Sequence, residues 1–584
     1  MTTSSTSSRS SSHSISVEKK TPFFTDKRIS TILLSACICG SGAAGLVNEY
    51  ILSTVSTYVL GGAIEQFSII IALMMLSMGV AGYIQQFFSD KNLIEKFIFI
   101  ECSLAIIGSF APMIIYFAFG YTETHFTLIQ YTCVVLIGGL IGFEIPLLLR
   151  INKEYSNTLK ANLAAILSFD YIGACLGAFV WVFFLLKTFP LTESSFLVSG
   201  SNFLIAMLAM VYFFKKDIIK KKKIIIVMAT VTTLAIVIGY FNNREFNHLM
   251  EQKFYDDPIQ FSETTKYQRL VITKNPTTGD TRLFINGNVQ FSSLDEDRYH
   301  EMLVHPIMKL SENNKDVLVL GGGDGLALKR ILDYKDVNSA MLVDLDPDMV
   351  KMSSTNELMK ELNGNVFNDS RVYNLVNEGV TDESWRQIFL ETNEKNENGD
   401  LITEGTDFVR TINIDADKFI ENIYQYGNKW GTVIVDFPDP SSIEVNKLYT
   451  KEFYLKVKRI MPDNGMMVIQ STSPYHAKEA FLTILNTVRS TGMNAIPYHI
   501  NIPAFGDWGY VLAWKDTSIS EIDMINKIKS IQSFDVETDF ITPDVLYAST
   551  VFGKGELESQ FNEINTLMNP RLLTFYRDYS WVVD

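Results

Sequence analysis

The chain has few residues of the types that build metal sites and disulfides. Only five of its 584 residues are cysteines, and all of them lie before residue 176. Cys37 and Cys39 are two residues apart, which points them to different faces of a helix, and no pair has the spacing of zinc ligands. The seven histidines are scattered singly. We therefore expect no metal site, and no disulfide in the C-terminal half.

Basic residues are also scarce in the C-terminal half, and this excludes nucleic acid as a partner. Residues 242–584 hold 33 Lys and Arg against 52 Asp and Glu, a net charge of −19. Residues 1–241 hold 17 against 13, a net charge of +4. Nucleic-acid binding requires a basic surface. An acidic half suits a cationic ligand, and the alternative is that its carboxylates are simply solvated.

Long apolar runs fill the first 241 residues. Residues 1–29 form a Ser-rich tail, predicted to be flexible, that lacks the apolar core of a secretory signal. Residues 30–241 are predicted to form an all-α, multi-pass bundle in the cell membrane, because a buried core of a soluble protein, the alternative, rarely has so many long apolar runs. The predicted spans are residues 30–51, 66–88, 96–118, 126–149, 161–186, 194–214 and 224–241.

Three acidic residues lie in or beside these apolar runs, namely Glu49, Glu144 and Asp170. Ionisable groups inside a membrane are costly and often mark a polar path. The alternative is helix packing, in which the carboxylates form hydrogen bonds to neighbouring helices, and the surrounding Gly and Ser residues favour it.

A change of pattern near residue 258 marks the beginning of a soluble half. β-rich runs at 269–274, 282–285 and 288–291, with a turn at Gly287, predict a small antiparallel unit over 258–310 that ends in a helix. An α/β domain of the Rossmann-like, methyltransferase type follows over 311–515, with a polar insertion at about 379–407, and an α-rich extension over 516–584. Its predicted strands are residues 316–320, 339–343, 408–414, 432–435, 465–471, 494–500 and 509–514.

A glycine-rich turn, Gly321-Gly322-Gly323-Asp324-Gly325, follows the first of these strands, and Asp344 follows the next. Glycines let the backbone approach a ligand, and an acid about 20 residues on accepts hydrogen bonds from ribose hydroxyls. This arrangement predicts an adenosine-type ligand.

Carboxylates follow several strands at the edge where ligands bind in open α/β sheets. They are Asp324, Asp344, Asp415, Asp436 and Asp439. Because the same motifs contain no Lys or Arg, we expect a pocket for a cation, with a metal site as the alternative.

The soluble half resembles the spermidine synthases, or polyamine aminopropyltransferases, over about residues 260–515. The motifs are Leu283-Phe-Ile-Asn-Gly-Asn-Val-Gln290, Asp297-Arg-Tyr-His-Glu-Met302, the glycine-rich turn, and Asp436-x-x-Asp439-Pro440. The front half resembles the membrane-embedded branch of that family. The supporting segments are Ala44–Glu49, Gln66–Ser68, Glu144–Pro146, Asp170–Gly173, Asn501–Gly509 and the tail from Asn565 to Trp581.

The resemblance implies a transferase. It would move an aminopropyl group from decarboxylated S-adenosylmethionine to a diamine, commonly putrescine, and release spermidine and methylthioadenosine. The donor is a co-substrate, and no other cofactor is implied. We expect the partners to be these two small molecules and the lipid bilayer, and the assembly to be a homo-oligomer, a dimer.

The resemblance also implies roles for single residues. Asp436 would be the general base, with Asp439 orienting the amine and Tyr299, His300 and Gln290 around its far end. Asp324 would pair with the donor ammonium and repel the carboxylate of intact S-adenosylmethionine. The other residues expected to contact the donor are Gln268, Gly321, Gly323, Asp344, Asp415 and Ala416. For each, the alternative is a structural polar residue with satisfied hydrogen bonds.

Some positions depart from the pattern of the soluble members. Asp344 stands where many have Glu, Ala416 where Gly is usual, and Phe505 where they have Tyr. The last departure removes a hydroxyl from the acceptor side and leaves the acceptor open. Two other functions are alternatives: a methyltransferase on the same scaffold, and a polyamine transporter or sensor that binds without turnover.

Two arguments about membrane sidedness conflict. Lys and Arg gather in the tail and in the second, fourth and sixth loops, which favours a cytoplasmic N-terminus, and seven crossings would then place the catalytic half outside. The donor derives from S-adenosylmethionine, which favours the cytoplasm. The last span, 224–241, is only 18 residues long and contains Thr230, Thr232 and Thr233. We therefore expect it to be re-entrant or packed along the bundle, with a cytoplasmic catalytic domain.

Overall fold

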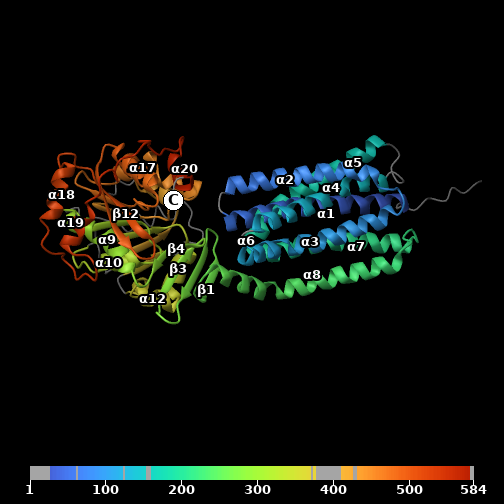
Figure 1. Ribbon diagram of the computed structural model, residues 1–584, viewed down its shortest axis with the longest axis horizontal. Coiled ribbons are helices and arrows are strands. Elements are labelled where there is room, and N and C mark those ends of the chain that lie inside the picture. The colour runs from blue at the N-terminus through green and yellow to red at the C-terminus, as the bar shows by residue number, and fades with distance from the viewer. Residues whose placement is uncertain are drawn as a thin grey trace, which may run out of the picture. The chain divides into compact units, whose positions relative to one another are not determined.

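The computed structural model describes residues 26–60, 63–122, 125–152, 159–337, 339–369, 372–375, 409–424 and 430–578. The chain divides into two compact units between Phe254 and Tyr255 (Figure 1). The predicted insertion at 379–407, most of the Ser-rich tail and Trp581 lie outside the described residues.

The first unit is a bundle of long helices, as predicted. Its main helices are α1 (Asp26–Leu60), α2 (Ala63–Ile84), α3 (Leu93–Tyr121), α4 (Phe126–Asn152), α5 (Leu159–Val180), α7 (Leu191–Lys215) and α8 (Lys222–Glu251). The fifth continues through a π turn, Trp181–Leu185, into α6 (Leu186–Thr188). Seven of the described helices are long and apolar enough to cross a membrane.

Small residues bring α1 and α5 into close contact. A Cβ atom on Gly173 would lie 2.0 Å from the carbonyl oxygen of Cys39, and one on Gly177 would lie 2.6 Å from that of Ala43. Both glycines therefore permit a helix approach that any side chain would block. The buried acid Glu144 of α4 accepts a hydrogen bond from Ser41 of α1, and this contact favours the packing interpretation of that residue.

Of the two alternatives expected for residues 224–241, the structure contradicts the re-entrant one and confirms packing along the bundle. α8 is one continuous helix of 30 residues that packs against α3 and α7. Arg244, near its end, donates to Glu193 in the first turn of α7 (2.8 Å), and Asn247 donates to Thr192. Polar residues continue the helix beyond the apolar run to Glu251. Within the apolar run, the hydroxyl of Thr233 donates a hydrogen bond to the carbonyl of Ala229 (2.8 Å). The segment is therefore as long as the other spans and is not re-entrant.

The second unit begins with an antiparallel sheet in the order β1-β2-β3-β4. Its strands are β1 (Ile259–Thr264), β2 (Arg269–Lys274), β3 (Thr281–Ile285) and β4 (Asn288–Ser292). The last three match the prediction, whereas β1 was missed. Asn286 and Gly287, both with positive φ, form the tight turn between β3 and β4.

The rest of the second unit is a Rossmann-like α/β domain, which confirms the predicted fold class. Among the described residues, eight strands pair in the order β11-β12-β10-β9-β5-β6-β8-β7, and β12 runs antiparallel to both of its neighbours while the other pairs are parallel. They are β5 (Asp316–Gly321), β6 (Ser339–Asp344), β7 (Val372–Leu375), β8 (Val409–Asn413), β9 (Thr432–Asp436), β10 (Met466–Gln470), β11 (Asn494–Ile502) and β12 (Gly506–Trp514). Of these, β7 was not predicted.

Helices cover both faces of this sheet because its central strands are buried on both sides. Leu318 and Leu320 of β5 face one core, and Val317 and Val319 face the other. The first core contains α14 (Ala416–Tyr424), α16 (Lys451–Arg459), α17 (Lys478–Arg489) and α20 (Arg571–Asp578). The second contains α9 (Glu296–Leu310), α10 (Leu326–Leu332), α18 (Glu521–Lys529) and α19 (Pro543–Ser549) (Figure 1).

Candidate active site

The candidate site lies at the carboxyl ends of three central strands. β5 has β6 on one side and β9 on the other, so the connections leave it in opposite directions. Ligands of open α/β sheets bind at such a switch point. The topology therefore brings together Asp324 after β5, Asp344 at the end of β6 and Asp436 at the end of β9.

Two glycines hold the turn after β5 against both neighbouring strands. A Cβ atom on Gly321, where φ is +90°, would lie 2.1 Å from the carbonyl oxygen of Asp436. One on Gly323 would lie 2.6 Å from Oδ2 of Asp344. Any other residue at either position would push the turn away from the acids.

Asp344 is held by backbone donors at the end of β6. Its Oδ2 accepts from the amide of Gly323 (3.0 Å), and its Oδ1 accepts from that of Asp346 (2.8 Å). Burial raises the pKa of Asp344 to about 7, and the neighbouring carboxylates of Asp346 and Asp324 add to the rise. The carboxyl is therefore fixed in orientation and poorly solvated, so a ligand that donates hydrogen bonds stabilises its ionised form.

Asp436 and Asp324 form an acidic pair. Tyr299 of α9 donates to Oδ1 of Asp436 (2.6 Å), which orients the carboxylate. The pKa of Asp436 is raised to about 6, chiefly by burial and then by the charge of Asp324, against the opposing effects of His300 and Tyr299. Burial also raises the pKa of Asp324. Because both acids repel one another in a poorly solvated place, the site favours a cation close to them.

Asp439 lies three residues further along and is surrounded by donors. Tyr576 of α20 (2.9 Å) and Thr472 (3.2 Å) donate to its Oδ2, and Gln470 donates to its Oδ1 (3.3 Å). Burial raises the pKa of Asp439 to about 6 in spite of these donors. Thr472 has a φ of +57°, which is unusual for a β-branched residue and is typical of functional sites.

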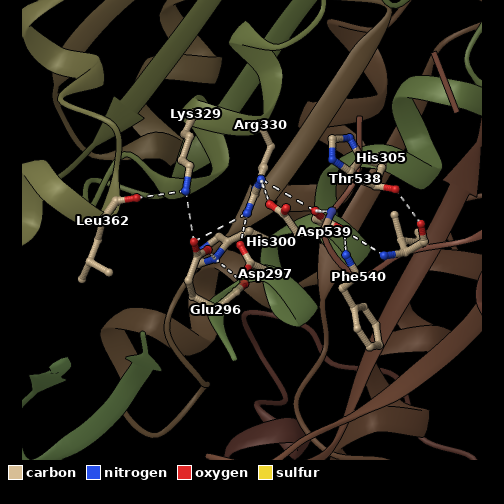
Figure 2. A network of polar contacts seen from close by, with 12 residues as sticks. Glu296, Asp297, His300, His305, Lys329, Arg330, Leu362, Thr538, Asp539 and Phe540 are labelled. Atoms are coloured by element: carbon tan, nitrogen blue, oxygen red, sulfur yellow. Dashed lines mark hydrogen bonds and ion pairs between the residues drawn. The ribbon is translucent and has the colours of Figure 1, made fainter. Parts of the chain in front are cut away.

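His300 of α9 belongs to a buried polar network (Figure 2). Its Nδ1 lies 3.1 Å from Oε2 of Glu296, one helical turn earlier, and Lys329 donates to Oε1 of the same carboxylate (3.2 Å). Burial by itself would raise the pKa of Glu296. The contacts with His300, Lys329 and Arg330 outweigh this effect and lower that pKa to about 2. Burial lowers the pKa of His300, but Glu296 and Asp324 raise it above its usual value. Glu296 thus favours the protonated form of His300 beside the acids.

Arg330 joins this network to the segment that follows α18. Its guanidinium, 4% exposed, contacts Asp297 of α9 and Asp539 (3.2 Å). Glu301, one turn after Asp297, accepts from the backbone amides of Asp539 (2.7 Å) and Phe540 (2.9 Å). The network therefore fixes α9, which carries Tyr299 and His300, against α10 and the C-terminal extension (Figure 2).

Not all predicted site residues contact the acids. Asp415 accepts from the backbone of Asp417 (3.0 Å) at the start of α14 and pairs with Lys447. Burial raises its pKa, but Lys447 lowers it below the ordinary value. Asp415 is therefore already paired with a cation of the protein, Lys447, which lies outside the motifs that carry the five acids. Ala416 is the first residue of α14 and is buried.

Two glutamines were also expected near the ligands. Gln268 forms a side-chain hydrogen bond with Asp346, two residues after Asp344, and so lies next to the donor-side acid. Gln290 of β4 donates to the backbone carbonyl of Asn288 (3.2 Å) in its own strand. In the described part of the chain, Gln268 is the better placed of the two.

Residues that the sequence analysis did not single out complete the acid side of the site. Glu296, Gln470, Thr472 and Tyr576 contact His300 or Asp439 directly. Phe505, which the sequence analysis did single out, lies edge-on to Tyr299, with ring centroids 6.1 Å apart. The spacing of Glu296 and His300, four residues apart on a helix, was a usable signal, whereas Tyr576 is 137 residues from Asp439.

Comparison with known proteins gives one consistent family. Residues 296–382 and 404–526 match the spermine/spermidine synthase domain. The chain is 33% identical over 539 residues to the polyamine aminopropyltransferase of Oceanobacillus iheyensis, covering 91% of this chain and 94% of that protein. It is also 33% identical over 557 residues to the polyamine aminopropyltransferase of Leptospira interrogans, covering 95% of this chain and 99% of that protein.

A solved structure of spermidine synthase from Thermotoga maritima also aligns with the chain. It covers 51% of this chain and 87% of its own length, at 21% identity and a TM-score of 0.40.

Proposed function

The chain belongs to the polyamine aminopropyltransferase family, and from this premise we propose that it is a membrane-bound enzyme that makes spermidine from putrescine. Members of the family use decarboxylated S-adenosylmethionine as the aminopropyl donor. The proposal goes beyond the family in naming the acceptor, the membrane and the residue roles.

The donor would lie along the carboxyl ends of β5 and β6. Asp344 accepts hydrogen bonds from the ribose hydroxyls, and the turn at Gly321 and Gly323 lets the backbone approach the ligand closely. Asp324 pairs with the terminal ammonium of the donor, and the same charge repels the carboxylate of intact S-adenosylmethionine. Gln268, which bonds Asp346, lines the ribose side.

Asp415 takes a different role from the one that the resemblance implies. Its carboxylate is already paired with Lys447 and with the first backbone amides of α14. We propose that it fixes the beginning of α14, so that Ala416 and the backbone around it, and not the Asp415 carboxylate, meet the adenine.

The chemical step needs a base because the diamine arrives protonated. The proton of one ammonium passes to the carboxylate of Asp436, and the freed nitrogen attacks the methylene carbon bound to the sulfonium. The carbon–sulfur bond breaks with its electrons going to sulfur, which releases neutral methylthioadenosine, and the new secondary amine carries the positive charge. A pKa of about 6 makes Asp436 a better proton acceptor than an ordinary aspartate.

The acceptor would be held between the two acids. Asp439 orients the reacting amine, and His300 and the hydroxyl of Tyr299 define the surroundings of Asp436. The observation that carries the proposal is the proximity of Asp324 and Asp436, two half-buried acids on adjacent strand ends that favour a cation.

Product analysis with the purified protein tests this function. Decarboxylated S-adenosylmethionine with putrescine should give methylthioadenosine and spermidine in equal amounts, and cadaverine or spermidine as acceptor should react more slowly. Transfer of a methyl group from intact S-adenosylmethionine would make the protein a methyltransferase. Amine binding without any release of methylthioadenosine would make it a sensor.

The proposal of a membrane location depends on the seven long apolar helices of the first unit. We keep the catalytic unit in the cytoplasm, where the donor is made, and we propose that the protein is a homodimer. If α8 crosses the membrane as the seventh span, a cytoplasmic catalytic unit requires an N-terminus on the outer face, against the basic residues of the tail. Labelling from outside intact cells tests this assignment directly.

A further inference from the structure

The C-terminal extension reaches the acid side of the candidate site. α20 (Arg571–Asp578) lies beyond the last residue, 526, that matches the family domain. Its Tyr576, half-buried, donates a hydrogen bond of 2.9 Å to Oδ2 of Asp439. The extension thus contributes a side chain to a carboxylate of the DxxD motif.

A buried asparagine fixes the beginning of this helix. Asn565 is fully buried, and its Oδ1 accepts from the amide of Leu572 (3.2 Å) in the first turn of α20. Its Nδ2 donates to the carbonyl of Tyr449 (3.0 Å), and its own amide donates to Thr487 (2.9 Å). The position of Tyr576 is therefore set by a network and does not depend on one contact.

The donors around Asp439 fill one oxygen of its carboxylate. Two carboxylate oxygens offer about four lone-pair positions. Tyr576 and Thr472 occupy both positions on Oδ2. Gln470 lies 3.3 Å from Oδ1, but its two hydrogens have nearer acceptors in the carbonyl of Phe437 (2.5 Å) and the hydroxyl of Tyr449 (2.7 Å). Oδ1 therefore remains open to a donor from the ligand.

We propose that Tyr576 is a positioning residue of the amine site, whose hydroxyl orients Asp439 so that Oδ1 accepts a hydrogen bond from a primary ammonium. The inference rests on the proposed function and adds the C-terminal extension to its machinery. It also gives a reason for the left-handed backbone at Thr472, which brings a second hydroxyl to the same oxygen. The titratable groups facing Asp439 are Tyr576 and Tyr449, and Tyr449 also faces Asp436, three residues before Asp439.

Tyr576→Phe tests the proposal because it removes the hydroxyl and keeps the ring. The hydroxyl fixes the orientation of Asp439 and lowers its pKa, so without it the dissociation constant of putrescine should rise by about 10-fold, or about 1.4 kcal/mol. Binding is measured by calorimetry on the full-length protein in detergent, with methylthioadenosine present, and needs no turnover. The affinity for methylthioadenosine itself should not change.

The pH dependence supplies a second readout that a structural role would not move. The Tyr576 hydroxyl lowers the pKa of Asp439, so its removal raises that pKa, and putrescine binding should weaken at a higher pH than in the unmodified protein. Tyr454→Phe is the matched control, because its buried hydroxyl has no hydrogen-bond partner among the described residues.

Each possible result of these binding measurements either supports the proposal or overturns it. Weaker putrescine binding with an upward pH shift in Tyr576→Phe alone supports the proposal. Unchanged putrescine binding, or an equal loss for putrescine and methylthioadenosine, overturns it. Normal putrescine binding in the unmodified protein without methylthioadenosine release in the presence of donor would refute the proposed function and leave the role of Tyr576 in amine binding standing.

Discussion

Two carboxylates with raised pKa values should give the reaction an unusually steep dependence on pH. Asp436 and Asp439 both have a pKa of about 6, and the proposed roles require both to be ionised. The diamine remains a dication over the range of interest, since alkylammonium groups lose protons near pH 10. The acid side of the profile of kcat/KM for putrescine should therefore depend on the product of two ionised fractions.

The expected magnitude follows from these values. At pH 5 each carboxyl is ionised in about one molecule of eleven, so both are ionised in about one of 120, whereas at pH 7 both are ionised in about four of five. kcat/KM should thus fall by about 100-fold between pH 7 and pH 5. In Asp439→Asn one of the two ionisations is gone, and the same interval should cost only about 10-fold.

The assay follows methylthioadenosine release by the full-length protein at saturating donor, with putrescine varied, in buffers from pH 5 to pH 8. Asp436→Asn should lose turnover by about 10²- to 10⁴-fold across this range, as expected for a general base. Glu537→Gln, which changes an exposed carboxylate, serves as the control.

The reasoning would be refuted by a profile that falls only tenfold between pH 7 and pH 5 in both the unmodified enzyme and Asp439→Asn. Near-normal turnover of Asp436→Asn would remove that residue from its role as base.

Three further predictions follow from other parts of the structure. Asp324→Asn should weaken the binding of decarboxylated S-adenosylmethionine by at least about 30-fold more than the binding of methylthioadenosine, because only the former has an ammonium. Equal losses of affinity in a binding titration would contradict the pairing of Asp324 with that ammonium. The fragment Tyr255–Asp584, a compact unit, should fold alone and keep measurable transfer, and a folded but inactive fragment would give the bundle a part in catalysis. A cysteine at the exposed Thr517, in a half without native thiols, should react with an impermeant maleimide only after cell lysis, and reaction in intact cells would place the catalytic unit outside.

The parts of the fold that depend on local pattern could be predicted from the sequence. The strand from Thr432 and the turn from Gly321 follow from apolar runs that end in glycine or acid, and their side-by-side position follows from the α/β topology. β1 and β7 were missed because β1 is half-exposed and mixed in character and β7 has only four residues. α8 was misjudged because its length was taken from apolar residues alone, although polar residues continue the helix to Glu251.

The parts of the site that depend on distant pairs could not be predicted. Lys447 neutralises Asp415 from 32 residues away, and Tyr576 approaches Asp439 from 137 residues away. Neither pair has a spacing that a helix or a strand would bring together, so only the tertiary fold makes them neighbours. Glu296 and His300 are the exception, since four residues on a helix place them on the same face.

The raised pKa values of the site acids also carry a thermodynamic cost for the protein without ligands. Asp344, Asp436 and Asp439 bind protons more tightly in the folded state than in the unfolded chain, where an aspartate titrates near pH 3.9. Their contribution to the free energy of unfolding is therefore complete below about pH 4 and is lost as the pH rises through 6 to 7. Bound cations reverse this loss, because they favour the ionised acids and expel their protons. Substrate binding near pH 6 should thus release protons to the buffer, tighten as the solution becomes more alkaline, and protect the enzyme against heat most strongly where the ligand-free protein is weakest.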